Sequence, residues 1–286
     1  MENLMDRRCL DHLLANEELR QFREHGFFIV ENAIPGHLVD RLIPLIDRVD
    51  AEARNRRGVA STDAITHFNF IGKDDLFLEL LDWHTTFPKV WGLMGWNVQL
   101  YHTHLTYTPP EPERLLERDG LGLGWHQDTG QLNRDLETSP RPMVSLKIGF
   151  FLSDTSSPGC GNFYVLPGSQ NRNDFPGETR NQETEGALPV LAKTGSAVFF
   201  DRRLWHSPST NFSNHPRRVL FYGYSYRWLR PRDDMTIEHY LDRSDPIRQQ
   251  LLGVSHSGGR GFTSPKPDDV PLRAWIEENV GAEATG

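Results

Sequence analysis

Beyond about residue 97, the chain consists of short apolar runs separated by turns rich in Gly, Pro, Asn and Asp. Apolar runs of about four to eight residues between such turns are typical of β-strands. Many short strands in succession indicate an antiparallel sandwich or barrel. We expect strands near 97–108, 122–128, 143–152, 161–166, 188–192, 195–201 and 217–228.

The N-terminal part of the chain has a different pattern, which predicts mainly helices. A short helix is expected at 17–24, and the apolar run at 27–30 suits a strand. From 37 to 56, apolar residues recur at the spacing of an amphipathic helix. The tail at 255–269 is rich in Gly, Ser and Pro, so we expect it to be mobile, with a last helix near 271–279.

The chain of 286 residues shows no internal repeat, and its length suits one large domain. We interpret the fold class as mainly β with α, in a single domain. It would comprise a helical region at about 1–95, a β core at about 97–228 and a C-terminal extension at 229–286.

Composition excludes several classes of protein. The net charge of −8 argues against a nucleic-acid partner, which would need a basic surface. No apolar run is long enough to predict a membrane span, and the charged N-terminus does not resemble a secretion signal. Cys9 and Cys160 form no disulfide framework or zinc motif. We therefore expect a cytoplasmic protein; no pattern indicates its oligomeric state.

Three side chains form a candidate metal site. His126 and Asp128 stand two positions apart in an expected strand, where such residues share a face. His206 follows much later in the chain, so only the fold could bring it to the other two. Two histidines and one carboxylate on one face of an ion leave positions open, as in Fe(II) oxygenases that bind a co-substrate and dioxygen together.

Arg217 is the candidate anchor for a co-substrate. It follows His206 after a turn-forming segment, which would return the chain as the neighbouring antiparallel strand. A planar guanidinium can bind a carboxylate through two hydrogen bonds, and we expect the distal carboxylate of 2-oxoglutarate there. Arg218 is the adjacent alternative, but neighbouring strand residues face opposite ways, so only one can point inward.

Together these motifs resemble the phytanoyl-CoA dioxygenase family of Fe(II)/2-oxoglutarate-dependent oxygenases. The likeness includes the His126-x-Asp128 pair, His206 with Arg217, the segment NFYVLPGSQ at 162–170, and FREHGFFIVENAIP at the start. It runs from about Phe22 to Trp228.

The resemblance implies a double-stranded β-helix (jelly-roll) core with helices packed on one sheet. It also implies Fe(II), 2-oxoglutarate and dioxygen as cofactor and co-substrates, and an oxidation that releases succinate and carbon dioxide. Related halogenases lack the carboxylate ligand, so Asp128 favours hydroxylation or another oxidation over halogenation.

Further residues are assigned to the co-substrate pocket by the same likeness. His104 stands where the family places a side chain beside 2-oxoglutarate, although a packed core histidine is nearly as good an interpretation. Lys147 lies in an apolar strand and must face solvent or meet an anion. Pro208 replaces a small hydroxyl residue that often assists the arginine, so Thr106 or Tyr107 would have to supply that contact.

The substrate is not encoded in these motifs. Loops between 107 and 122, 130 and 140, and 170 and 186 would surround the entrance. Nothing resembles a basic site for coenzyme A phosphates, so we expect a small organic molecule such as a natural-product intermediate. Candidate substrate contacts are Gln131, Asn133, Arg134 and Trp228.

Two alternatives remain at this point. A catalytically inactive jelly-roll binding protein would be expected to have lost one of the ligands, whereas all three and Arg217 are present. A cupin-like metalloenzyme with non-oxidative chemistry would group two histidines and a glutamate in one motif, and this chain does not.

Overall fold

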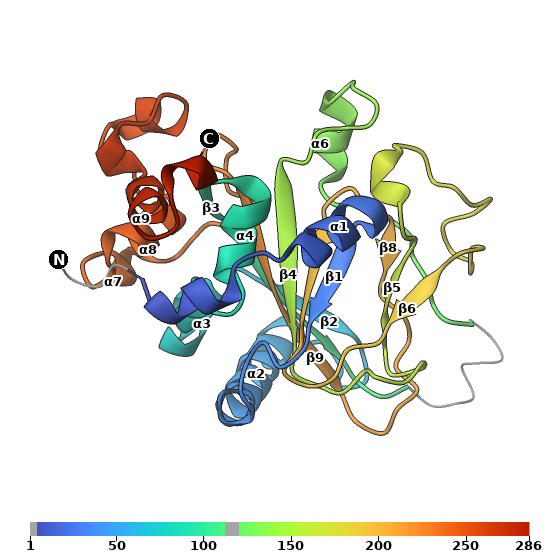
Figure 1. Cartoon of the computed structure of the whole chain (residues 1–286). Coiled ribbons are helices and arrows are strands. Elements are labelled where there is room, and N and C mark those ends of the chain that lie inside the picture. The colour runs from blue at the N-terminus through green and yellow to red at the C-terminus, as the bar shows by residue number, and fades with distance from the viewer. Residues whose placement is uncertain (1–4, 112–119, 286) are drawn as a thin grey trace.

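Two antiparallel sheets form the centre of the molecule, and most helices cover the outer face of the larger sheet (Figure 1). The computed structural model describes residues 5–111 and 120–285. The strand order is β1-β7-β4-β9-β3-β2 in the larger sheet and β6-β5-β8 in the smaller one. This arrangement confirms the expected antiparallel β core with flanking helices.

The strands vary from long central ones to short ones at the sheet margins. The larger sheet contains β1 (Phe27–Val30), β2 (Ile65–Phe68), β3 (Val98–Thr108), β4 (Ser145–Phe151), β7 (Ala197–Asp201) and β9 (Arg217–Tyr226). The smaller sheet contains β5 (Phe163–Val165), β6 (Leu188–Val190) and β8 (His206–Ser207).

The helices come mainly from the two ends of the chain, and no described helix is long and apolar enough to cross a membrane. The α-helices are α1 (Asn16–His25), α2 (Gly36–Arg57), α3 (Asp75–Glu79), α4 (Phe87–Met94), α6 (Gly130–Asp135), α7 (Glu238–Leu241), α8 (Pro246–Leu251) and α9 (Pro271–Asn279). Short 3-10 helices are η1 (Arg7–His12), η2 (Ile71–Lys73), η4 (Ser169–Asn171), η5 (Gly258–Phe262), η6 (Pro267–Asp269) and η7 (Ala282–Thr285).

Three expectations from the sequence differ from the structure. The segment 122–128 is not a regular strand, because within it only His126 pairs as a β-bridge. Strand β2 was not expected, since four residues carry too little periodicity to be recognised. The tail 255–269 contains η5 and η6, held by the carboxylate of Asp269, which accepts hydrogen bonds from the backbone N–H groups of Ser257 and Lys266.

The central strands are buried on both faces, and their alternate residues serve two different cores. On β9, Leu220, Tyr222 and Tyr224 point into the helix-covered core. The hydroxyls of both tyrosines donate to backbone carbonyls, Tyr222 to Phe77 at 2.7 Å and Tyr224 to Leu81 at 2.5 Å. These bonds fix α3 and the turn after it against the larger sheet.

The opposite face of β9 packs against the smaller sheet. Val219 and Phe221 belong to a second apolar cluster that also includes Phe163 and Val165 of β5. This cluster joins the two sheets and forms the apolar side of the space between them. Side chains that project into this space from the larger sheet are therefore candidates for the functional site.

Two glycines make room on this inner face. Gly223 of β9 pairs with His102 of β3, and an added Cβ would lie 2.6 Å from the imidazole Nδ1 of His102. Gly149 of β4 pairs with Phe221, and its added Cβ would lie 2.8 Å from that ring. The small residues thus allow large rings to lie flat across the sheet.

Replacing Gly223 with alanine is expected to destabilise the fold by about 1–3 kcal/mol, because the new methyl group overpacks a site filled by the buried ring of His102. Urea unfolding measures this loss. Gly36→Ala is the control: nothing lies within 4 Å of an added Cβ there. The interpretation is wrong if Gly223→Ala unfolds at the same urea concentration as the wild type.

Candidate metal and co-substrate site

A reciprocal pair of backbone hydrogen bonds brings the two histidines together. The N–H of His126 donates to the carbonyl of His206 at 3.0 Å, and the N–H of His206 donates to the carbonyl of His126 at 3.0 Å. The N–H of Asp128 donates in turn to the carbonyl of Arg202 at 2.9 Å. This irregular pairing keeps His126 and Asp128 on one side without the strand expected there, and places the two imidazole centroids 4.3 Å apart.

His126, Asp128 and His206 offer ligand atoms that all lie within 4.8 Å of one another. The Nε2 of His206 is 3.9 Å from Oδ1 of Asp128. Each imidazole bonds through Nδ1 to a backbone carbonyl, His126 to Gly124 at 2.9 Å and His206 to Leu204 at 2.8 Å. A neutral imidazole that donates from Nδ1 has a free lone pair on Nε2, which is the form that binds a metal.

The buried carboxylate of Asp128 has one oxygen paired and one without a partner. Lys147 donates from Nζ to Oδ1 at 2.7 Å, whereas Oδ2 has no hydrogen-bond partner among the described residues. Burial works to raise the pKa of Asp128, but Lys147 and the two imidazoles together hold it below its usual value. Burial lowers the pKa of His206 to about 3. The group therefore combines an ionised carboxylate with a neutral imidazole.

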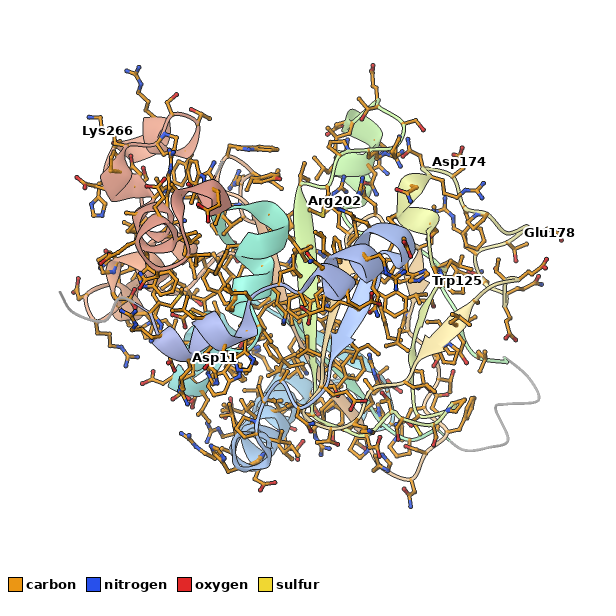
Figure 2. All side chains as sticks on the ribbon, viewed as in Figure 1. Asp11, Trp125, Asp174, Glu178, Arg202 and Lys266 are labelled. Carbon is orange, nitrogen blue, oxygen red and sulfur yellow. The ribbon has the colours of Figure 1, made fainter. Side chains whose placement is uncertain are left out.

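A second layer of polar contacts supports the backbone of Asp128. Asn133 of α6 donates from its amide to the carbonyl of Asp128 at 2.9 Å. The guanidinium of Arg202, which is fully buried, donates to Oδ1 of Asn133 at 2.6 Å and to the hydroxyl of Thr129 at 3.0 Å. Figure 2 labels Arg202 in the interior, near the upper end of β4 and α6. Asn133 thus holds the backbone of Asp128 in place without lining the cavity itself.

Arg217 lies in the same cavity and is 2% exposed. Its side chain makes no hydrogen bond to any described residue, and its Nε is buried without a partner. Its guanidinium lies 5.4 Å from the ring centroid of Phe151, and burial lowers the pKa of Arg217 to about 10. Arg218 faces the other way and pairs with Asp47 at 2.7 Å. The strand alternation predicted from the sequence therefore selects Arg217 as the inward residue.

A pair of histidines on β3 forms another wall of the cavity. His102 Nε2 and His104 Nδ1 are 3.1 Å apart and share a hydrogen bond. The ring of His104 stacks on Phe221, with centroids 4.4 Å apart, and Nδ1 of the buried His102 has no hydrogen-bond partner within the described chain. Burial lowers the pKa of both imidazoles well below the usual value, so both are neutral.

The cavity has a volume of about 260 Å³. It contains most of the residues that the sequence assigned to metal and co-substrate. Its lining comprises Thr66, Phe68, His104, Thr106, His126, Asp128, Lys147, Phe163, Phe200, His206, Pro208, Arg217, Phe221 and Arg232.

The four residues predicted to contact substrate are not part of this lining. On α6, the guanidinium of Arg134 donates a hydrogen bond to the side-chain carbonyl of Gln131, and Asn133 donates one to the backbone carbonyl of Asp128. Trp228 is 48% exposed and stacks on Tyr226, with ring centroids 5.6 Å apart. Tyr107 does not line the cavity, and residues 112–119 of the first predicted entrance loop lie outside the described part of the chain.

The chain is similar to a known family over most of its length. The family model of phytanoyl-CoA dioxygenase matches residues 22–219. The chain belongs to the phytanoyl-CoA dioxygenase family. It is therefore an Fe(II)- and 2-oxoglutarate-dependent oxygenase, as the resemblance of its motifs predicted. The family match supports neither of the two alternatives, the inactive binding protein and the cupin-like enzyme with non-oxidative chemistry.

Solved structures share the fold at low sequence identity. HygX from Streptomyces hygroscopicus, with nickel and 2-oxoglutarate bound, has a TM-score of 0.59 and 16% identity, covering 74% of this chain and 87% of its own. EctD from S. alaskensis, with 2-oxoglutarate and 5-hydroxyectoine, has a TM-score of 0.53 and 18% identity, covering 74% and 76%. The epimerase SnoN from nogalamycin biosynthesis has a TM-score of 0.50 and 16% identity, covering 73% and 82%. No curated protein sequence matches the chain.

Sequence reasoning missed several residues of this oxygenase's cavity. Thr66 and Phe68 lie on β2, which was not expected as a strand. The register pairs Thr66 with Thr106 and Phe68 with His104, so β2 extends the wall formed by β3. Arg232 lies after the last strand, in a segment without any motif. Had β2 been recognised as an edge strand, its alternation would have pointed Thr66 and Phe68 inward.

We expect Lys147→Met to destabilise the metal-free oxygenase by about 3–5 kcal/mol, because it leaves the buried carboxylate of Asp128 without its cation. A metal ion at the site would replace that compensation. Anaerobic Fe(II) should therefore raise the free energy of unfolding of Lys147→Met by more than it raises that of the wild type.

Urea unfolding with and without Fe(II) measures both effects. Lys193→Met is the matched control, because Lys193 pairs with Glu31 on the surface at 3.4 Å and should contribute no more than about 1 kcal/mol. An equal gain from Fe(II) in Lys147→Met and in the wild type would contradict electrostatic coupling between Lys147 and the metal ligands.

Proposed function

We propose that His126, Asp128 and His206 bind Fe(II), that Arg217 binds the distal carboxylate of 2-oxoglutarate, and that the enzyme hydroxylates an unactivated C–H bond of a small organic molecule. The observation that carries this proposal is Arg217: a buried guanidinium without an anionic partner among residues 5–111 and 120–285, in one cavity with three convergent ligand side chains. A buried charge is costly unless it is paired, so the site is built for an anion.

The donor set fits the metal. Two imidazoles with free Nε2 atoms and a carboxylate with a free Oδ2 form the two-histidine, one-carboxylate set used for non-haem Fe(II). When bound, iron and 2-oxoglutarate supply the oxidising chemistry, with succinate and carbon dioxide as products. The carboxylate ligand Asp128 supports hydroxylation or another oxidation over halogenation.

The protein contributes orientation and charge. Nδ1 bonds from His126 and His206 fix both rings, and Lys147 fixes the carboxylate of Asp128 beside them through Oδ1. Arg217 fixes the far end of the co-substrate through the planar guanidinium. Aromatic rings of Phe163, Phe200 and Phe221 line the space between these groups and limit the access of water.

We infer that His104 presents a hydrogen-bond donor to the co-substrate. Within the histidine pair, one nitrogen donates and the other accepts. If His104 donated, neutral His102 would carry an unpaired buried N–H at Nδ1, which is rarer than an unpaired acceptor. His102 is therefore the donor, and the remaining proton of His104 lies on Nε2. Thr106, beside it on the lining, offers a hydroxyl in place of the one that Pro208 lacks.

The substrate assignment is less specific. The cavity size suits a small organic molecule such as a natural-product intermediate. Contacts from Gln131, Asn133, Arg134 and Trp228 stay predictions, and from their present positions they would require movement of α6 or of the segment after β9. A cytoplasmic location likewise stays a prediction from the sequence.

Anaerobic titration with Fe(II) and 2-oxoglutarate tests the proposal through the weak visible charge-transfer band of the complex. Arg217→Gln is expected to raise the dissociation constant for 2-oxoglutarate by more than about 30-fold, which corresponds to the loss of about 2 kcal/mol or more when a buried charge pair is truncated. Asp128→Ala should abolish the band, because a metal ligand is lost.

Arg218→Gln is the matched control for Arg217→Gln. Arg218 is the next residue of the same strand but pairs with Asp47 outside the cavity. It should bind 2-oxoglutarate as the wild type does and lose at most about 1 kcal/mol of stability. Absence of the band and of succinate release in the wild type would contradict the proposed function.

His104→Phe is expected to weaken 2-oxoglutarate binding by about 10-fold, since a hydrogen bond to a charged acceptor contributes about 1.5–3 kcal/mol. Fe(II) binding should not change. His104→Gln keeps a donor and should recover part of the affinity. The same titration of the charge-transfer band measures both variants, and equal affinity of His104→Phe and wild type would show that His104 is a packed core residue.

A further inference from the structure

Among the described residues that line the cavity there is a third cationic side chain, Arg232, that the proposed metal and co-substrate sites do not use. Arg232 lines the cavity with Phe68, and its guanidinium lies 5.3 Å from the ring centroid of Phe68. Phe68 is 52% exposed, which is unusual for a large apolar side chain. An exposed ring covered by a guanidinium therefore forms part of the entrance.

The backbone around Arg232 is fixed to the larger sheet. The N–H of Arg232 donates to the carbonyl of Tyr101 at 2.8 Å. The carboxylate of Asp233 accepts from the backbone N–H of Thr103 at 2.6 Å and from its hydroxyl at 3.1 Å. These contacts with β3 hold the segment beside the cavity, so the position of Arg232 is set by the fold.

Arg232 has no ion-pair partner among the described residues. The neighbouring carboxylate of Asp233 accepts hydrogen bonds from Thr103, and among the described residues no salt bridge or side-chain hydrogen bond includes Arg232. The other two cationic side chains of the cavity have an anionic partner or are assigned one. Lys147 pairs with Asp128, and the proposed function assigns Arg217 to 2-oxoglutarate.

Charge balance in the loaded site favours a negatively charged substrate. Fe(II), Lys147 and Arg217 carry four positive charges, whereas Asp128 and the two carboxylates of 2-oxoglutarate carry three negative ones. Lys147 and Arg217 are buried, so the remaining positive charge of the loaded site is weakly screened. Arg232 is exposed and adds a cation at the edge of the cavity, where the neighbouring carboxylate of Asp233 is bound to Thr103. This distribution of charge attracts an anion.

We propose that the substrate carries a carboxylate or another oxyanion, that Arg232 binds this group, and that an apolar part of the substrate packs on Phe68. This inference rests on the proposed function and assigns the class of substrate to the same site. With the anion held at the entrance by Arg232 and the apolar part directed inward, the C–H bond to be oxidised lies several bonds away from the anionic group.

The test measures binding of matched compounds to the anaerobic complex of enzyme, Fe(II) and 2-oxoglutarate. Aromatic and aliphatic carboxylic acids are compared with their primary amides, and phosphate monoesters with the parent alcohols. Calorimetry and perturbation of the charge-transfer band measure binding, and succinate release in air is a second readout. The proteins are wild type, Arg232→Gln, Arg232→Lys and, as the control, Arg230→Gln, an exposed arginine outside the cavity lining.

We expect at least one acid or phosphate ester to bind the wild type about 10-fold or more tightly than the matched amide or alcohol, as a charge-assisted contact of about 1.5–3 kcal/mol implies. Arg232→Gln should remove this preference, Arg232→Lys should retain part of it, and Arg230→Gln should not affect it.

The proposal is overturned if no anion in the panel binds better than its neutral partner, or if the preference survives in Arg232→Gln. The 2-oxoglutarate band of each variant separates this result from failure of the proposed function. A normal band without an anion preference rejects only the role of Arg232, whereas a wild type without the band rejects the oxygenase site and this inference together.

Discussion

The reciprocal backbone pairing of His126 with His206 is the constraint on which the functional site depends. It joins the segment after β3 to strand β8, and it sets both imidazoles in one short stretch of antiparallel pairing. The side chains need little further adjustment, because each Nδ1 bonds to a carbonyl two residues earlier in its own segment. The metal ligands are thus positioned mainly by backbone hydrogen bonds, which are strong in a buried site.

Buried charge is the second principle of this site. Lys147 and Arg217 are both buried cations of the same cavity, but only one of them has a counter-ion there. Lys147 has its counter-ion within the protein, which keeps Asp128 ionised, whereas Arg217 has none in the part of the chain that the structure describes. The structure therefore separates a cation that orients a ligand from a cation that must receive its anion from outside. This difference distinguishes the co-substrate pocket from an ordinary buried ion pair.

The sequence allowed the prediction of those parts of the site that depend on local spacing. The choice of Arg217 over Arg218 follows from alternation along β9. His126 and Asp128 were grouped correctly by their spacing, although an irregular backbone pairing, and not the expected strand, brings them together. Asn133 stays a predicted substrate contact; its hydrogen bond to the backbone carbonyl of Asp128 was not predicted, because it depends on the position of α6. Arg232 and Phe68 could not be predicted, since their place at the entrance depends on the pairing of β2 with β3 and on Asp233 bonding to Thr103.

The two faces of the larger sheet explain how such an enzyme can change its substrate without losing its fold. Along β9, Leu220, Tyr222 and Tyr224 serve the helix-covered core, where two buried hydroxyls are bonded to backbone carbonyls. Arg217 and Phe221, on the alternate positions, face the cavity. Substitutions that face the cavity therefore leave the larger core intact. The residues at the entrance are even less constrained by packing. Phe68 lies on an edge strand and Arg232 follows the last strand, so both can be substituted without disturbing the metal ligands.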